Sequence, residues 1–155
     1  MNTYERIFGS GPRGALIGTI LFVIIFLLED IVKLPKIVDN SIVRFTVFFI
    51  FSFVGIIILC WSLKSLPVNQ RGKSLITTGA YHYFRHPLYA AFSTFINIGV
   101  SFLLNNWIYI VWTVTLFPVW ALNVKQEEAL MRDQFGNEYE DYCKQTWRFF
   151  PKITR

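Results

Sequence analysis

Four long apolar segments occupy much of this 155-residue sequence and limit the folds that it can adopt. They are residues 14–28, 42–63, 88–104 and 107–124. Each holds roughly 15 to 22 residues, close to the length that an α-helix needs to cross a bilayer. A backbone exposed to lipid has to satisfy its hydrogen bonds within its own segment, which favours helices. We therefore predict an all-α, polytopic membrane protein with four transmembrane helices.

The composition agrees with this fold class. Apolar residues make up 54% of the chain and aromatic residues 18%, both high for a soluble domain. We expect a single domain over residues 1–155, because neither repeats nor a linker interrupt the chain. The first apolar segment could also be read as a signal peptide, since Arg6 and Arg13 precede it. No small-residue cleavage site follows, and residues 29–33 continue a helical pattern, so we expect a spanning helix instead.

The shorter intervals predict how the helices begin, turn and end. Residues 1–13 should form an interfacial lead whose glycines and proline keep it out of the first helix. Asn105 and Asn106 alone separate the third and fourth helices, which must therefore turn back tightly on each other. Pro118 should kink the fourth helix near its end. Beyond the fourth segment, the spacing of apolar residues predicts an amphipathic helix lying along the membrane and broken at Gly136.

The distribution of charge predicts the orientation in the membrane. Four spans place both termini and the long 64–86 interval on one side of the membrane. Of the 15 Lys and Arg residues, all but Lys33, Lys36 and Arg44 fall on that side. Because positive charge is retained in the cytoplasm, we expect both termini there. The net charge of +5 then reflects topology and attraction to anionic headgroups, and we expect no nucleic-acid partner.

The stretch 75–89 concentrates most of the polar chemistry. Arg85 and His86 come directly before Pro87, which suits the first turn of a helix. The proline also favours an extended backbone at His86, so the pair should lie in a loop at the water boundary. The pair could serve only as an interfacial anchor, with a snorkelling arginine inside an aromatic belt. Alternatively, it could face a ligand.

The paired carboxylates Glu127 and Glu128 belong to the same side of the membrane as the Arg85–His86 loop. Two polar clusters far apart in sequence can therefore form one pocket, which is what a site requires. Neither a metal site nor a disulfide framework is expected. Cys60 and Cys143 lie too far apart, and two histidines without cysteine partners do not make a zinc site.

Two motifs in the second half of the chain carry a family resemblance. They are ITTGAYHYFRHPLY at residues 76–89 and EEALMRDQFGNEYEDY at residues 127–142, followed by RFFP. Together they resemble the isoprenylcysteine carboxyl methyltransferase and phospholipid methyltransferase family, with the similarity running from about Lys73 to Pro151. The resemblance implies an integral membrane enzyme with S-adenosylmethionine bound at the cytosolic face in this half of the chain. The enzyme would take a lipophilic acceptor from the bilayer.

The resemblance also implies roles for individual positions. Residues that would bind the cofactor are Lys73, Ser74, Leu75, Ile76, Tyr81, His86, Pro87, Leu88, Tyr89 and Glu127. Arg85 and Glu128 would lie beside the methyl-transfer site as candidate catalytic residues. Asn123 stands where the isoprenylcysteine enzymes carry an arginine that contacts the substrate. This difference puts a prenylcysteine carboxylate in doubt and favours an acceptor with less negative charge.

The chemistry of these side chains agrees with the implied roles. Glu127 can pair with the ammonium or ribose hydroxyls of the cofactor, Arg85 can hold a carboxylate bidentately, and the rings of Tyr81 and His86 can flank adenine or the sulfonium. Methyl transfer is an in-line displacement that depends chiefly on positioning. A carboxylate acceptor is already nucleophilic, whereas an amine or thiol needs a base, for which Glu128 is the candidate. Otherwise, Glu128 belongs to a solvated helix face.

The sequence leaves both the acceptor and two other functions open. The acceptor could be an isoprenylcysteine-like carboxylate, a phospholipid amine or another small lipophilic molecule. A sterol-reductase relative would bind a nicotinamide nucleotide in a similar carboxyl-terminal fold. A non-catalytic membrane scaffold of the same fold would use Arg85, His86 and the two glutamates only as interfacial anchors.

Overall fold

Four membrane-length helical segments form the body of the protein, as the sequence predicted. The computed structural model describes residues 11–70 and 72–152. The segments are α2 (Gly11–Val32), α3 (Ser41–Ser65), a composite third segment and α6 (Trp107–Phe135). The third segment joins α4 (Pro87–Ala90), a π-helical stretch η3 (Ala91–Ile96) and α5 (Asn97–Leu104). All four are long and apolar enough to cross a membrane, so the protein is a multi-pass membrane protein.

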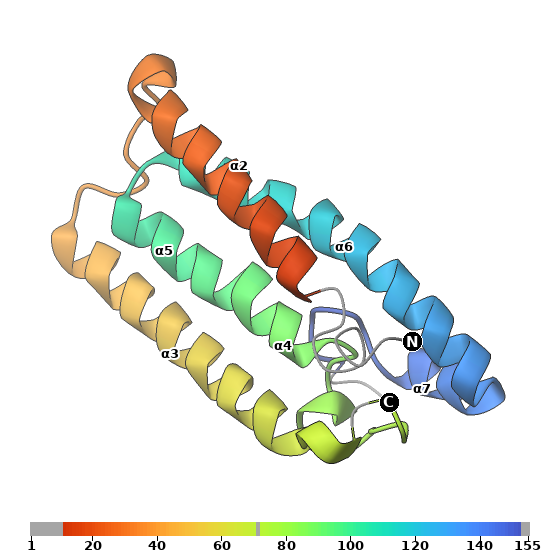
Figure 1. Ribbon diagram of the computed structural model, residues 1–155. Coiled ribbons are helices and arrows are strands. Elements are labelled where there is room, and N and C mark those ends of the chain that lie inside the picture. The colour runs from red at the N-terminus through yellow and green to blue at the C-terminus, as the bar shows by residue number, and fades with distance from the viewer. Residues whose placement is uncertain (1–10, 71, 153–155) are drawn as a thin grey trace.

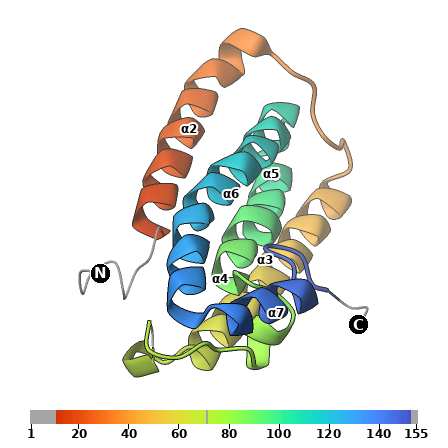
Figure 2. The same ribbon diagram turned by 90° about the vertical axis from the view of Figure 1, so that its right-hand side faces the viewer.

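The helices pack in the order α2, α6, α5 and α3 (Figures 1 and 2). The short helices η1 (Val68–Gln70), η2 (Gly79–His82) and α7 (Asn137–Gln145) gather at one end of this bundle, beside the start of α2. Large apolar side chains of α2 and α3 remain exposed, for example Leu27, Phe49 and Phe53. Such surfaces are suited to lipid, which agrees with the membrane assignment.

Two expected helix boundaries were wrong. α2 begins at Gly11, so residues 11–13 belong to the helix; the first ten residues of the expected interfacial lead lie outside the described part of the chain. Proline is tolerated in the first turn of a helix because its missing N–H has no intrahelical acceptor there. The fourth helix continues unbroken to Phe135, so Pro118 lies well inside it rather than near its end. The predicted break at Gly136 is confirmed, and the amphipathic helix is α7 alone.

The third segment packs closely on α3 because small residues lie between them. A side chain at Gly55 would place its Cβ 2.6 Å from Ile96 Cγ1, and one at Gly99 would lie 2.8 Å from Ser52 Oγ. Glycine therefore lets the two backbones approach, as is common between membrane helices. Pro87 occupies the first turn of this segment, as predicted. The π-helical stretch was not foreseen, since the sequence around it reads as ordinary helix.

The far end of the bundle is closed by the two asparagines between α5 and α6. Asn105 adopts the left-handed conformation with φ of 58°, and its side chain exchanges two hydrogen bonds with the backbone of Val38. Asn106 caps α6 and donates to Glu29 Oε1, while Tyr109 donates to the other oxygen of Glu29. The predicted tight turn is confirmed. Residues 29–44 and the asparagine pair therefore lie at the end opposite to the polar loops.

Candidate active site

The Arg85–His86 loop is held in place by the chain after α7. Arg85 N donates to Trp147 O at 2.7 Å, and His86 N donates to Arg148 O at 3.0 Å. Phe84 and Trp147 form an isolated parallel β-bridge beside these bonds. The loop therefore gains the backbone partners of a short strand pair, so Arg85 and His86 have defined positions at the start of α4.

Glu128 anchors a cluster of cations beneath this loop. Its side chain is fully buried, and Arg148 donates to both carboxylate oxygens, at 2.9 and 2.6 Å. Arg85 NH1 donates to Glu128 Oε1 at 3.1 Å, while Arg85 NH2 donates to Thr146 O. Two guanidinium groups thus hydrogen-bond to one carboxylate, and a third, that of Arg132, lies 3.8 Å from Glu128 Oε2. A buried carboxylate is tolerated only with such partners, so this cluster ties α6, the loop and the end of the chain together.

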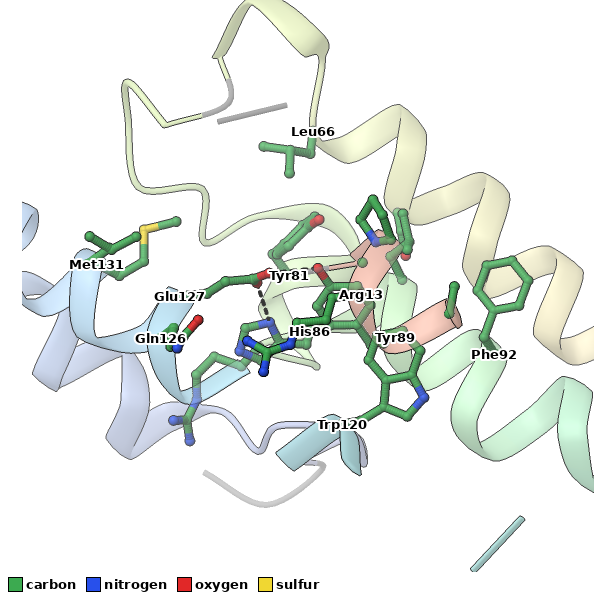
Figure 3. Close-up of a pocket in the computed structure, with 18 of the residues that line it drawn as sticks. Arg13, Leu66, Tyr81, His86, Tyr89, Phe92, Trp120, Gln126, Glu127 and Met131 are labelled. Atoms are coloured by element: carbon green, nitrogen blue, oxygen red, sulfur yellow. Dashed lines mark hydrogen bonds and ion pairs between the residues drawn. The ribbon is translucent and has the colours of Figure 1, made fainter. Parts of the chain in front are cut away.

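Glu127, the preceding residue on α6, faces a cavity instead. Tyr89 OH donates to Glu127 Oε1 at 2.8 Å, and His86 Nδ1 lies 3.7 Å from Glu127 Oε2 (Figure 3). The other ring nitrogen of His86 lies 3.4 Å from Glu128 Oε1. His86 therefore sits between the two carboxylates and connects the buried cluster to the cavity.

Aromatic rings continue from this polar point toward the membrane. His86 stacks on Tyr89 with the ring centroids 5.7 Å apart and an interplanar angle of 16°. Tyr89 in turn stacks on Trp120 at 4.8 Å and 24°. The faces of such rings attract cations, and their bulk excludes water.

A large cavity runs from these groups into the bundle. Its volume is about 1440 Å³, and its lining comes from α2, the end of α3, the 72–81 interval, the third segment, α6 and α7. At one end lie Arg85, His86 and Glu127; further in, Phe22, Trp112 and Leu116 make the lining apolar. A single molecule in the cavity could therefore contact both charged groups and an apolar surface.

The structure brings most of the predicted site residues to this cavity. Ser74, Leu75, Ile76, Tyr81, Arg85, His86, Leu88, Tyr89 and Glu127 all line it. Lys73, Pro87 and Glu128 do not: Pro87 is buried at the start of α4, and Glu128 is enclosed in its ion-pair cluster. Asn123 also lies outside the cavity, in a neighbouring hollow of about 230 Å³, and donates to Val119 O. Its expected contact with the acceptor stays a prediction.

Several residues of the site were missed by sequence reasoning. Arg148 holds Glu128 more closely than any predicted residue, and Trp120 extends the aromatic stack. The RFFP motif contains Arg148 and was a usable signal, but its partner is 20 residues away. Tyr142 donates to Tyr81 O at 2.7 Å and to Phe84 O at 3.3 Å, which secures the loop from α7.

The pKa values of Tyr142 and Arg148, which lie outside the transmembrane helices, favour the protonated forms that make these hydrogen bonds. Burial raises the pKa of Tyr142 above its ordinary value of 10.0, so the phenol stays protonated and keeps donating. The hydrogen bond to Glu128 raises the pKa of Arg148. Both groups therefore keep their donor protons to a higher pH than they would in water.

The fold and site together define a multi-pass membrane protein with a cavity that joins a charged, interfacial end to the interior of a helical bundle. Residues 47–133, more than half of the chain, match the isoprenylcysteine carboxyl methyltransferase (ICMT) family. The chain belongs to this family, as its two motifs indicated.

Curated relatives carry the corresponding name. The chain is 30% identical over 95 residues to protein-S-isoprenylcysteine O-methyltransferase of Schizosaccharomyces pombe. The matched region covers 59% of this chain and 40% of the relative. It is 29% identical over 119 residues to a probable protein-S-isoprenylcysteine O-methyltransferase of Oryza sativa subsp. indica, covering 66% and 62%. For the Dictyostelium discoideum enzyme the identity is 34% over 83 residues, covering 51% and 33%. The chain thus spans between 33% and 62% of the length of these relatives.

Proposed function

We propose that this protein is a membrane methyltransferase that uses S-adenosylmethionine and acts on a lipophilic acceptor. The observation that carries the proposal is the cavity, which joins Glu127, His86 and Tyr89 to the apolar surface of Phe22, Trp112 and Leu116. A charged cofactor that enters from the aqueous end could meet there an apolar acceptor that stays in the membrane. Family membership and the names of the relatives support the same activity.

The residues at the charged end suit the cofactor. When bound, S-adenosylmethionine supplies a methyl group on a positively charged sulfur, and transfer leaves the bonding electron pair on that sulfur. Glu127 offers a carboxylate for a cation, and the stacked rings of Tyr89 and Trp120 offer aromatic faces beside it. Ser74, Leu75, Ile76 and Tyr81 add the remaining wall. We assign the cofactor to this end of the cavity.

Arg85 and Glu128 have different roles in this proposal. Arg85 lines the cavity and can orient an acceptor, whereas Glu128 is enclosed by Arg85 and Arg148. Proton uptake by this carboxylate would weaken its hydrogen bonds to two guanidinium groups, so it is a poor general base. We propose that Glu128 is a positioning residue, which holds Arg85 and His86 at the cavity. Catalysis then depends on orientation and the exclusion of water.

We further propose that the cavity opens toward the cytoplasm. The charged end of the cavity lies at the same end of the bundle as η2 and α7. Three lysines belong to helix segments at this end: Lys64 at the end of α3, Lys125 in the later part of α6 and Lys144 in α7. Positively charged flanks remain in the cytoplasm, which supports this orientation. Arg6, Arg71 and Arg155, which contributed to the predicted charge bias, lie outside the described residues.

Methyl transfer to extracted lipids tests the proposal directly. Purified protein in nanodiscs would receive radiolabelled S-adenosylmethionine and either a total lipid extract or N-acetyl-S-farnesylcysteine. We expect label in the apolar fraction, lost in Arg85→Ala and retained in Lys144→Ala, which changes an exposed residue of α7. If calorimetry shows binding of a nicotinamide nucleotide instead, the sterol-reductase alternative holds. Binding of neither cofactor would favour the scaffold.

A further inference from the structure

The first turn of α2 lies directly against the aromatic stack of the site. A side chain at Gly11 would place its Cβ 3.6 Å from the ring and hydroxyl of Tyr89. At Gly14 the Cβ would lie only 2.5 Å from Trp120 Cζ3. The backbone of α2 therefore contacts Tyr89 and Trp120 without intervening side chains. Arg13, between the two glycines, must emerge beside the cavity.

Arg13 borders two spaces at once. It lines the large cavity that contains Glu127 (Figure 3). It also lines the smaller hollow that contains Asn123 and Gln126. The two spaces are thus neighbours across Arg13. A cation on α2 is therefore present next to Asn123, where α6 itself supplies no charge.

Arg13 and the other cation of the cavity differ in their partners. Among the described lining residues, the permanent cations are Arg13 and Arg85. Arg85 is bound to Glu128 and Thr146. For Arg13, the described part of the chain provides neither an ion pair nor a hydrogen bond to its guanidinium, and the side chain is exposed. A guanidinium in this state can hold an incoming anion through a bidentate contact.

We propose that Arg13 determines acceptor specificity by binding a carboxylate at the polar end of the acceptor. This inference rests on the proposed function and names a residue outside both sequence motifs. It also changes the interpretation of Asn123. The prediction of a less negative acceptor considered the charge of α6 alone, whereas α2 brings a positive charge to the same hollow.

A snorkelling contact with lipid phosphate is the competing explanation for Arg13. The glycine contacts argue for the cavity, because they hold the backbone on either side of Arg13 against Tyr89 and Trp120. The two explanations differ in what they require of the membrane. A headgroup contact depends on anionic lipid, whereas acceptor binding does not.

A pair of ligands that differ in one charge tests the inference. N-acetyl-S-farnesylcysteine and its methyl ester would be titrated without cofactor against the full chain in nanodiscs of phosphatidylcholine. We expect wild type to prefer the acid. Arg13→Gln should lose roughly 10-fold in affinity for the acid, the low end for a charge-assisted hydrogen bond, with little change for the ester. Arg13→Lys should keep part of the preference.

Lys125→Gln is the matched control, because Lys125 lies on α6 but lines neither space, and it should keep the wild-type preference. Thermal unfolding of each variant reports whether the fold survives. The inference is overturned if wild type shows no preference for the acid, or if Arg13→Gln retains it. It is equally overturned if the effect of Arg13→Gln appears only when phosphatidylserine is added. These titrations contain no cofactor and measure binding alone. The radiolabel assay tests methyl transfer, so a failure of the proposed function can be distinguished from a failure of this inference.

Discussion

Glu127 and Glu128 are adjacent on α6 but lie in opposite environments. Successive residues of a helix point roughly 100° apart, which follows from 3.6 residues per turn. Glu127 therefore faces the cavity and accepts from Tyr89, while Glu128 is fully buried under Arg85 and Arg148. One turn of helix thus provides both a cavity-facing carboxylate and the anchor that positions the loop.

Replacing Glu127 by Gln should weaken S-adenosylmethionine binding. A hydrogen bond to a charged group contributes about 1.5 to 3 kcal/mol, which corresponds to roughly 10- to 150-fold in affinity. Isothermal titration calorimetry would measure the change. Glu138→Gln, on the exposed face of α7, is the control and should bind as wild type does. Unchanged affinity in a folded Glu127→Gln protein would remove Glu127 from the cofactor site.

Replacing Glu128 by Gln should damage the fold of the loop and reduce the rate without altering its pH dependence. Removing one partner of a buried ion pair typically costs about 3 to 5 kcal/mol, because the remaining charges lose their compensation. Thermal unfolding and a pH profile of methyl transfer near neutrality would be recorded for both proteins. Parallel profiles support the positioning role. With an amine acceptor, a rate that rises with pH in wild type but not in Glu128→Gln would instead indicate that Glu128 is a general base.

Two glycines of α2 should respond differently to alanine. In Gly14→Ala the new Cβ would meet Trp120 at 2.5 Å, so α2 has to move away from the site; overpacking of this kind costs about 1 to 3 kcal/mol. In Gly18→Ala it would lie 3.3 Å from Leu116 Cδ2, a methyl group that can yield. We expect weaker binding of N-acetyl-S-farnesylcysteine in Gly14→Ala only. Equal affinities in the two variants would contradict the close contact of α2 with the aromatic stack.

Tyr142 should make the protein less stable at alkaline pH. Its pKa is raised by burial, so the folded state keeps a proton that the unfolded state releases above the ordinary pKa of 10.0. Stability from this group is complete below that value and declines as the pH rises beyond it. Tyr142→Phe removes the ionisable hydroxyl. The variant should therefore be less stable at neutral pH and show a smaller alkaline decline in its unfolding temperature, whereas identical slopes would exclude Tyr142 as the source.

The two ends of the bundle should lie on opposite sides of the membrane. In a background lacking Cys60 and Cys143, Lys36→Cys should react with a membrane-impermeant maleimide from the side opposite to Lys73→Cys and Lys152→Cys. From the positive charge bias we expect positions 73 and 152 to face the cytoplasm. Labelling of positions 36 and 152 from the same side would contradict both the four-span topology and the shared cavity.

The helices and their turns could be predicted from sequence because their causes are local. A run of apolar residues long enough for a bilayer specifies a span, Pro87 suits a first turn, and Asn105 and Asn106 suit a tight connection. Gly136 ended a helix for the same kind of reason, since its φ of +52° is readily adopted by glycine. The continuation of α6 to Phe135 was missed because the change from apolar to charged residues marks the membrane boundary and does not by itself end a helix.

The candidate site was only partly predictable, since its geometry depends on contacts between distant residues. The motifs identified Arg85, His86 and both glutamates, and RFFP contained Arg148. The sequence did not show that Arg148 would enclose Glu128 or that Arg13 would border the hollow of Asn123. Apolar spans such as α2 have little contrast between their faces, so the sequence does not say which face meets which neighbour. Sequence alone thus determined the spans and the chemical groups available at their ends. Only tertiary packing decided which of those groups face the cavity, because close contacts at positions such as Gly14 set the rotation of each helix.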